Sequence, residues 1–75
     1  MIDAETMANL QFAEYEYDIY EEDGHIFGCE FDLFNNQKYF YYKTIRKNGT
    51  EYYQYLDGDI YEAIKQFNAI LDEVG

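Results

Sequence analysis

Carboxylate side chains dominate the first half of this 75-residue chain and are its main source of chemistry. The first 37 residues hold ten Asp and Glu and no Lys or Arg. Glu14, Glu16 and Asp18 alternate with apolar residues, the pattern of a half-buried strand with an anionic outer face. Glu30 and Asp32 repeat that pattern in a second segment. Such rows of carboxylates can form charge-assisted hydrogen bonds with Arg and Lys side chains of a partner.

The other reactive side chains do not match an enzyme's site. His25 and Cys29 are the only residues of their types, and a Cys/His nucleophile also needs close contact and an orienting third group. We expect a histidine at a turn and a small buried thiol instead. The three carboxylates in residues 57–62 lack the spacing of a calcium loop and fit a helix cap. Without a phosphate loop, zinc spacing or nucleophile elbow, the sequence predicts no enzymatic activity, cofactor or metal.

The elements that must position the acidic rows are predicted from hydrophobic periodicity. Alternation with period two predicts four strands, and a change to helical spacing predicts one amphipathic helix. The expected ranges are 11–21, 26–34, 38–46 and 51–56 for the strands and 59–74 for the helix. Residues 1–10 are expected to form an arm or a short helical turn capped by Asp3. The sequence thus predicts a single α+β domain: a four-stranded antiparallel β-meander with the C-terminal helix on one face.

Turn residues predict how the strands are joined. Asn48-Gly49 is expected to form a two-residue type I′ turn, because both residues tolerate positive φ. In the first hairpin the inward residues of both strands are odd-numbered, so the numbers of facing partners must sum to an even value. A three-residue loop at residues 22–24, with Gly24 left-handed, satisfies this rule.

This register has consequences for both sides of the first hairpin. It places Glu14 opposite Asp32 and Glu16 opposite Glu30, which keeps like charges facing one another across the strands. Such a local electrostatic cost is more typical of function than of folding. On the other side of the second strand, the alternation places apolar residues toward the core. These inward residues are Phe27, Cys29, Phe31 and Leu33.

Tyrosines crowd the third and fourth strands, on both of their faces. The helix can cover only one face, so some of these rings must remain exposed or cover an interface. Tyr supplies large, rigid contact area with a polar tip, and it also fills small cores. Tyr53 and Tyr55 are therefore candidate binding residues if they lie opposite the helix, and packing residues otherwise.

The net charge of −11 limits the possible partners. Nucleic acids and anionic membranes attract positive charge, so neither is an expected partner, whereas a basic protein surface is. The acidic face is either a solvated surface or the site for such a partner. Two rows of carboxylates could compete for a groove in which Arg and Lys follow phosphates. A lone Cys and the lack of a long apolar run predict a cytoplasmic protein.

In length, charge, β-rich architecture and lack of catalytic motifs, the chain resembles the small acidic inhibitors of phages and mobile elements, including anti-CRISPR proteins and other DNA mimics. This resemblance implies stoichiometric inhibition of a nucleic-acid-binding protein. The residues expected to contact the partner are Glu14, Glu16, Asp18, Glu30, Asp32, Tyr53 and Tyr55. Two alternatives remain open: a self-associating or accessory module, for instance a homodimer, that uses a tyrosine-rich sheet face, and an immunity or antitoxin protein that neutralises a basic nuclease.

Overall fold

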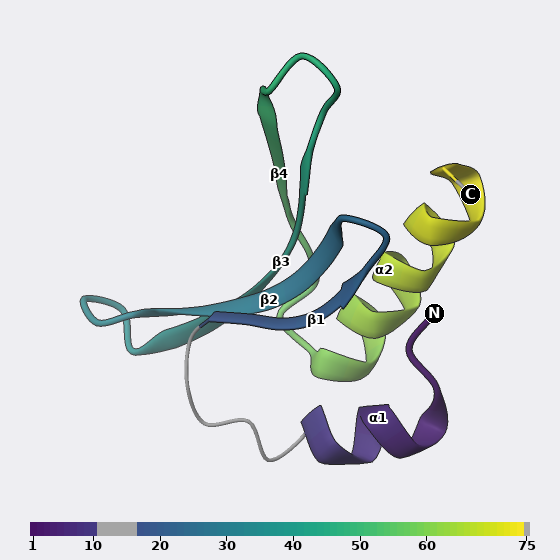
Figure 1. Ribbon diagram of the computed structural model, residues 1–75. Helices are drawn as coiled ribbons and strands as arrows, with labels where there is room; N and C mark the ends of the chain where they lie inside the picture. Colours follow the sequence, from purple (N-terminus) through teal and green to yellow (C-terminus); the bar gives the residue numbers. More distant parts are fainter. Residues whose placement is uncertain (11–16, 75) are drawn as a thin grey trace.

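The computed structural model describes residues 1–10 and 17–74 and confirms the α+β architecture (Figure 1). One antiparallel sheet has the strand order β1-β2-β3-β4. Its strands are β1 (Tyr17–Glu22), β2 (His25–Asp32), β3 (Gln37–Ile45) and β4 (Glu51–Tyr55). The helices are α1 (Ala4–Leu10) and α2 (Ile60–Val74). The predicted start of the first strand, residues 11–16, lies outside the described residues.

Both helices begin at the capping residues that the sequence indicates. The carboxylate of Asp3 accepts the amide of Thr6 at 2.8 Å, and that of Asp59 accepts the amide of Glu62 at 3.1 Å. Each bond satisfies an amide that the first turn leaves without a helical partner. In the described ranges, neither helix is long and apolar enough to cross a membrane.

The core lies between α2 and one face of the sheet. Phe67 of α2 is fully buried, and its ring meets those of Tyr20, Phe27 and Tyr42 at centroid distances of 5.9, 5.5 and 6.1 Å. Phe27 also stacks on Phe40 at 5.6 Å. Other buried members of this core are Ile2, Cys29, Ala63, Ile64 and Leu71. Phe67 therefore joins α2 to the sheet through contacts with three aromatic rings.

Ile2 fastens the N-terminal segment to this core. Its side chain is buried, and its backbone amide donates to Oδ1 of Asn68 on α2 at 2.9 Å. The side-chain amide of Asn68 donates back to the carbonyl of Ile2 at 3.3 Å. This reciprocal pair holds the segment before α1 against α2.

The turn between β1 and β2 differs from the predicted one. Asp23 and Gly24 have φ values of 52° and 83°, and the flanking Glu22 and His25 are paired. The connection is thus a two-residue turn with positive φ at both positions, and the three-residue loop at residues 22–24 was a wrong prediction.

A β-bulge in β1 restores the even sum that the apolar pattern demands. Near the turn the residue numbers of each pair, such as Glu22 and His25, add up to an odd value. The register shifts between Asp18 and Tyr20, and beyond this shift Tyr17 pairs with Cys29, whose numbers add up to an even value. The parity argument was right for Tyr17 and Cys29, although the extra residue lies in the strand and not in the loop. The predicted facing of Glu14 and Glu16 with β2 lies outside the described residues.

The turn between β3 and β4 also differs. The amide of Gly49 donates to the carbonyl of Arg46 at 2.8 Å, and that of Arg46 donates to the carbonyl of Thr50 at 2.9 Å. Gly49 has a φ of 83°, whereas Asn48 does not have positive φ and instead accepts the amide of Thr50 with its side chain at 2.9 Å. A single αL glycine after a tight turn matches the bulged hairpin loop, so the type I′ prediction was wrong here.

The far end of the β2–β3 hairpin lacks the burial that its sequence pattern predicts. Leu33 is 82% exposed and Phe34 is 100% exposed, while Phe31 is 38% exposed. Figure 1 shows this hairpin extending beyond both helices, and β2 ends at Asp32. Phe31 lies on the same side of β2 as Cys29, as the alternation predicts, but the predicted burial of Phe31 and Leu33 was wrong because α2 does not reach that end of the sheet.

Candidate protein-binding face

Four of the predicted contact residues come together on the sheet face opposite α2. Cross-strand pairing and alternation place Asp18, Glu30, Tyr53 and Tyr55 there, because their neighbours in each strand face the core. Glu14 and Glu16 lie outside the described residues. We use the name tyrosine face for the side chains of Tyr39, Tyr41, Tyr53 and Tyr55 together with Asp18 and Glu30.

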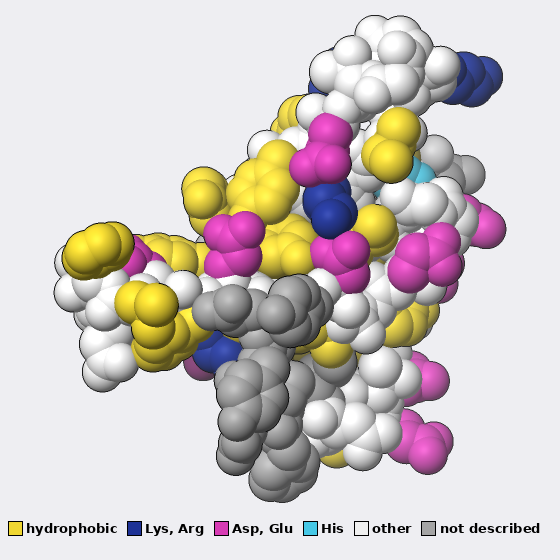
Figure 2. All heavy atoms as spheres, turned by 60° about the vertical axis from the view of Figure 1, so that its left-hand side comes forward, with side chains coloured by type: hydrophobic (Ala, Val, Ile, Leu, Met, Phe, Trp, Pro, Cys, Tyr) yellow, Lys and Arg dark blue, Asp and Glu magenta, His cyan; other side chains and the backbone are white. Residues whose placement is uncertain are grey.

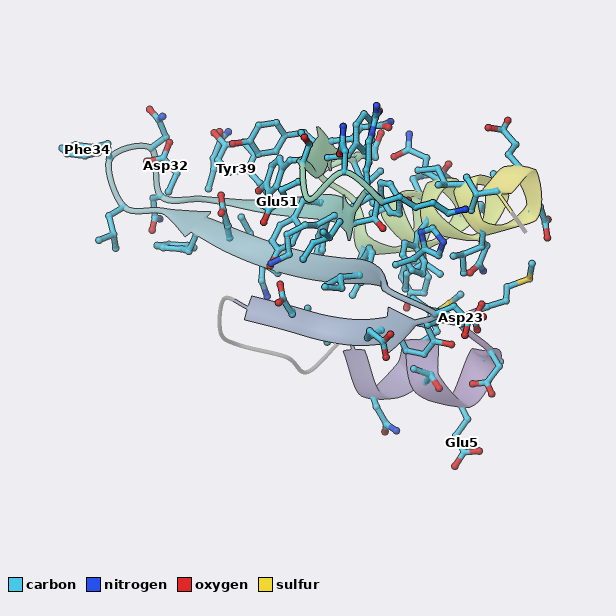
Figure 3. All side chains as sticks on the ribbon, turned by 45° about the horizontal axis from the view of Figure 1, so that its top comes forward. Glu5, Asp23, Asp32, Phe34, Tyr39 and Glu51 are labelled. Atoms are coloured by element: carbon cyan, nitrogen blue, oxygen red, sulfur yellow. The ribbon has the colours of Figure 1, made fainter. Side chains whose placement is uncertain are left out.

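Asp32, which is also a predicted contact residue, forms hydrogen bonds within the turn that follows β2. Its carboxylate accepts the amides of Phe34 and Asn35 at 2.9 and 3.3 Å and the side-chain amide of Asn35 at 2.6 Å. These bonds, led by the one from the Asn35 side chain, hold the pKa of Asp32 below its usual value. Asp32 thus orders the β2–β3 turn, and Figure 3 shows Phe34 at the tip that this turn presents.

A glycine in β2 makes room for the central ring of the face. A Cβ on Gly28 would clash with Cζ, Oη and Cε1 of Tyr41, so this ring lies directly across the glycine. From there the hydroxyl of Tyr41 reaches over β2 and donates to Oδ1 of Asp18 on β1 at 2.6 Å. Three strands are thereby joined by one side chain.

Lys43 completes a polar cluster around Asp18. Its Nζ lies 3.1 Å from the Asp18 carboxylate and 5.9 Å from the centroid of the Tyr41 ring. The hydrogen bond from Tyr41 and the charge of Lys43 hold the pKa of Asp18 below its ordinary value. Asp18 therefore enters any complex already ionised and oriented.

The four tyrosine rings form a continuous layer. Tyr41 stacks on Tyr53 at 5.0 Å, and Tyr55 meets the edges of Tyr53 at 5.1 Å and Tyr39 at 5.9 Å. These are the offset and edge-to-face arrangements that aromatic pairs prefer. Tyr55 remains 62% exposed. The layer is thus rigid, because each ring is held by another, and it is also accessible.

Tyr53 has a polar atom that the described residues leave unsatisfied. Its hydroxyl oxygen is buried and has no hydrogen-bond partner among them. Burial, together with the negative charge of Glu30, raises the pKa of Tyr53, so the hydroxyl stays protonated. A buried hydrogen-bond donor without an acceptor lowers the stability of the fold. An acceptor supplied by a partner would remove this cost.

Carboxylates border this aromatic layer. Figure 2 shows the hydrophobic side chains gathered at the centre of the face, with acidic groups beside them and few basic ones. Glu30 and Glu51 are exposed on this side of the sheet. Aromatic rings beside carboxylates suit guanidinium and ammonium groups, which can stack on a ring and bond a carboxylate at once.

Sequence reasoning missed two residues that organise this face. Gly28 and Tyr41 were not singled out, although an isolated glycine inside a strand pattern is a known sign of close approach by another group. The pairing of Gly28 with Tyr41 depends on the register between β2 and β3. The expected roles of His25 and Cys29 are confirmed in position, since His25 follows the turn and Cys29 is fully buried.

We expect Tyr41→Phe to change how stability depends on pH. A carboxyl whose folded pKa is lowered stabilises the protein above its unfolded pKa, here near 3.8, and this contribution is lost as the pH falls through the folded pKa. Without the Tyr41 hydroxyl, the pKa of Asp18 should rise, and stability at neutral pH should fall by about 1 kcal/mol because Asp18 is half-exposed. Denaturant titrations should show the two proteins converging in acid.

Tyr52→Phe is the matched control for this prediction. The hydroxyl of Tyr52 donates to the neutral side chain of Gln54 at 3.0 Å, so its loss should leave the pH dependence unchanged. A Tyr41→Phe curve parallel to that of the wild type down to acid pH would contradict the coupling of Tyr41 to Asp18.

Comparison of the chain with protein-family models, curated proteins and solved structures gives no match. Its function must therefore be argued from the tyrosine face itself.

Proposed function

We propose that this protein is a non-enzymatic inhibitor that binds, through the tyrosine face, a basic surface with which another protein holds nucleic acid. The observation that carries the proposal is the rigid layer of four tyrosines bordered by the carboxylates of Asp18 and Glu30. Rigid aromatic area lowers the entropy cost of binding, and tyrosine is enriched at binding hot spots.

The charge of the whole chain supports a basic partner. At −11, the protein would be attracted over long range to an Arg- and Lys-rich groove, which raises the association rate. Contacts of such residues with Asp18, Glu30 and the tyrosine rings would then select the site. Nucleic acid and the protein would compete for the same groove. We propose that this competition takes place in the cytoplasm.

The small acidic inhibitors that the sequence resembles supply a biological setting for this proposal. In that setting the partner is an effector of a defence system, such as a CRISPR nuclease complex. A dedicated immunity protein for a basic nuclease would have the same electrostatics. A toxin gene next to the gene for this chain would favour the immunity role.

The direct test is capture of the partner from host lysate in the presence and absence of duplex DNA. The affinity tag belongs at the C-terminus, because Ile2 is buried and a tag before it would disturb the core. We expect one nucleic-acid-binding protein to be recovered and then lost when DNA is added in excess. Recovery of no such protein, or of one that DNA does not displace, would refute the competition.

Charge reversal on the tyrosine face should weaken this binding. Glu30→Lys places a positive charge beside Tyr53, where the partner is expected to present its own positive charges. We expect an affinity loss of tenfold or more, or about 1.4 kcal/mol or above, measured by calorimetry with the captured protein. Asp72→Lys, on an exposed position of α2, changes the net charge equally and is the control. Equal losses would show that only net charge matters.

A further inference from the structure

Strand β4 presents an open edge. The amide of Leu56 donates to the carbonyl of Phe40 at 2.8 Å, so the backbone of Leu56 points toward β3. Because bonding directions alternate along an antiparallel strand, the backbone groups of Glu51, Tyr53 and Tyr55 point away from β3. Figure 1 shows no described element beside β4 on that side.

Strand β4 has few of the devices that protect edge strands, apart from its short length and the charge of Glu51. Strand β1, at the other edge, carries the bulge between Asp18 and Tyr20. The pairing of β4 with β3 is regular from Glu51 to Tyr55, and β4 contains neither Pro nor Lys. An unprotected, regular edge is a template for pairing with another strand.

A groove follows β4 on the side that faces α2. It is lined by residues from the end of β4 and the loop after it, residues 54–57, and from the second half of α2: Gln66, Ala69, Ile70 and Glu73. On the opposite side of the same strand lie Tyr53 and the exposed ring of Tyr55. A strand added to β4 would therefore find contact area for its side chains on both faces.

We propose that this edge is occupied by a second copy of the chain, with the two β4 strands paired antiparallel around a two-fold axis at Tyr53. This register places Glu51 of each copy opposite Tyr55 of the other, and each of these pairs exchanges two backbone hydrogen bonds. Tyr52 then faces Gln54 of the other copy, directly over the groove beside α2. No like charges face each other along the strand pair.

Local charge favours a second copy over a different occupant. Residues 38–47 hold four of the five basic residues and no carboxylate, against a net charge of −11 for the chain. The two-fold register brings the loop that carries Arg46 and Lys47 level with Asp57 of the other copy. The β4 edge is thus a place where two acidic chains can meet with opposite charges in contact.

The dimer would have a consequence for the tyrosine face. A two-fold axis perpendicular to the sheet joins the two sheets edge to edge and leaves both tyrosine faces on the same side. This proposal does not depend on the proposed function. If both hold, the dimer presents two equivalent faces to a partner, which raises apparent affinity where the partner offers repeated sites.

Sedimentation velocity of the full chain at rising concentration tests the dimer. We expect the mass to approach twice the 9.0 kDa of one chain. Tyr55→Pro removes an amide donor that points away from β3, so it should abolish the dimer and leave the β3–β4 pairing intact. Tyr55→Thr also loses the ring but keeps the amide, and it should weaken association less than Tyr55→Pro. A chain that stays monomeric throughout would overturn the proposal.

The expected contact between Lys47 and Asp57 of the other copy provides a second test of the dimer, and it leaves β4 unchanged. This test remains decisive if Tyr55→Pro does not fold. Lys47→Glu should weaken the dimer several-fold, whereas Lys38→Glu, at the far end of β3, should not. Hydrogen exchange should show the amides of Tyr53 and Tyr55 gaining protection as concentration rises. A dimer that keeps its affinity in Lys47→Glu, without protection at these amides, would place the contact elsewhere and refute the proposal.

Discussion

Replacing Gly28 with alanine is expected to lower the free energy of unfolding by about 2–4 kcal/mol, from an overpacked contact and a weakened charge-assisted hydrogen bond. The new Cβ would occupy the space of the Tyr41 ring, which would have to move away from β2. Its hydroxyl would then lose Asp18, and its ring would lose the stack with Tyr53. Thermal unfolding followed by circular dichroism measures this loss.

Gly58→Ala makes the same chemical change without the clash. A Cβ at Gly58 meets no atom within 4 Å, and its φ is not positive. This variant should match the wild type or gain slightly, by up to about 1 kcal/mol, because alanine restricts the unfolded chain. If Gly28→Ala were as stable as Gly58→Ala, the Tyr41 ring could not lie across β2 as described.

The fold was predictable because each element carries its own local signal. Alternation identified β2, β3 and β4 to within a few residues, and the change of period at Asp59 identified α2 together with its cap. These signals depend on neighbours in sequence only. The packing of the C-terminal helix α2 on one face of the sheet followed from the order of the elements.

The two tightest turns were predicted with their types exchanged. Asp23-Gly24 forms the two-residue turn expected at Asn48-Gly49, and residues 46–50 form the bulged loop expected at the first hairpin. Both pairs tolerate positive φ, so composition alone cannot distinguish them. What decides is the register of the flanking strands, and in β1 that register includes a bulge that no local pattern marks.

The sequence predicted which residues of the first hairpin share a face of the sheet, because side chains alternate along a strand. It did not predict which side chains touch one another across strands. Parity placed Asp18 and Glu30 together on the face away from the core, and the structure confirms this. It left the face of Tyr53 and Tyr55 open, and the pairing of β3 with β4 places both of them on the same side as Asp18 and Glu30. Their environment was not predictable, because the position of Tyr41 over Gly28 requires residues from β2 and β3 to be in register. Parity also does not reveal the local role of Asp32, whose carboxylate accepts a hydrogen bond from Asn35 in the adjacent turn.

Phe67→Ala should unfold much of the protein, because the loss of a buried phenylalanine costs about 3–5 kcal/mol and a domain this small has little more than that in total. Phe67 is fully buried, and it is the ring through which α2 contacts Tyr20, Phe27 and Tyr42. Far-UV circular dichroism and NMR line widths measure the folded fraction.

Phe34→Ala is the matched control, because it removes the same side chain from a position that is 100% exposed. Its stability should stay within about 0.5 kcal/mol of the wild type. A large loss in Phe34→Ala would show that the tip of the β2–β3 hairpin packs against the chain after all. A fully folded Phe67→Ala would show that α2 is held to the sheet by something other than this aromatic core. We expect Phe67→Ala to unfold and Phe34→Ala to stay folded, because burial in the fold, and not residue type, determines how much each phenylalanine contributes to stability.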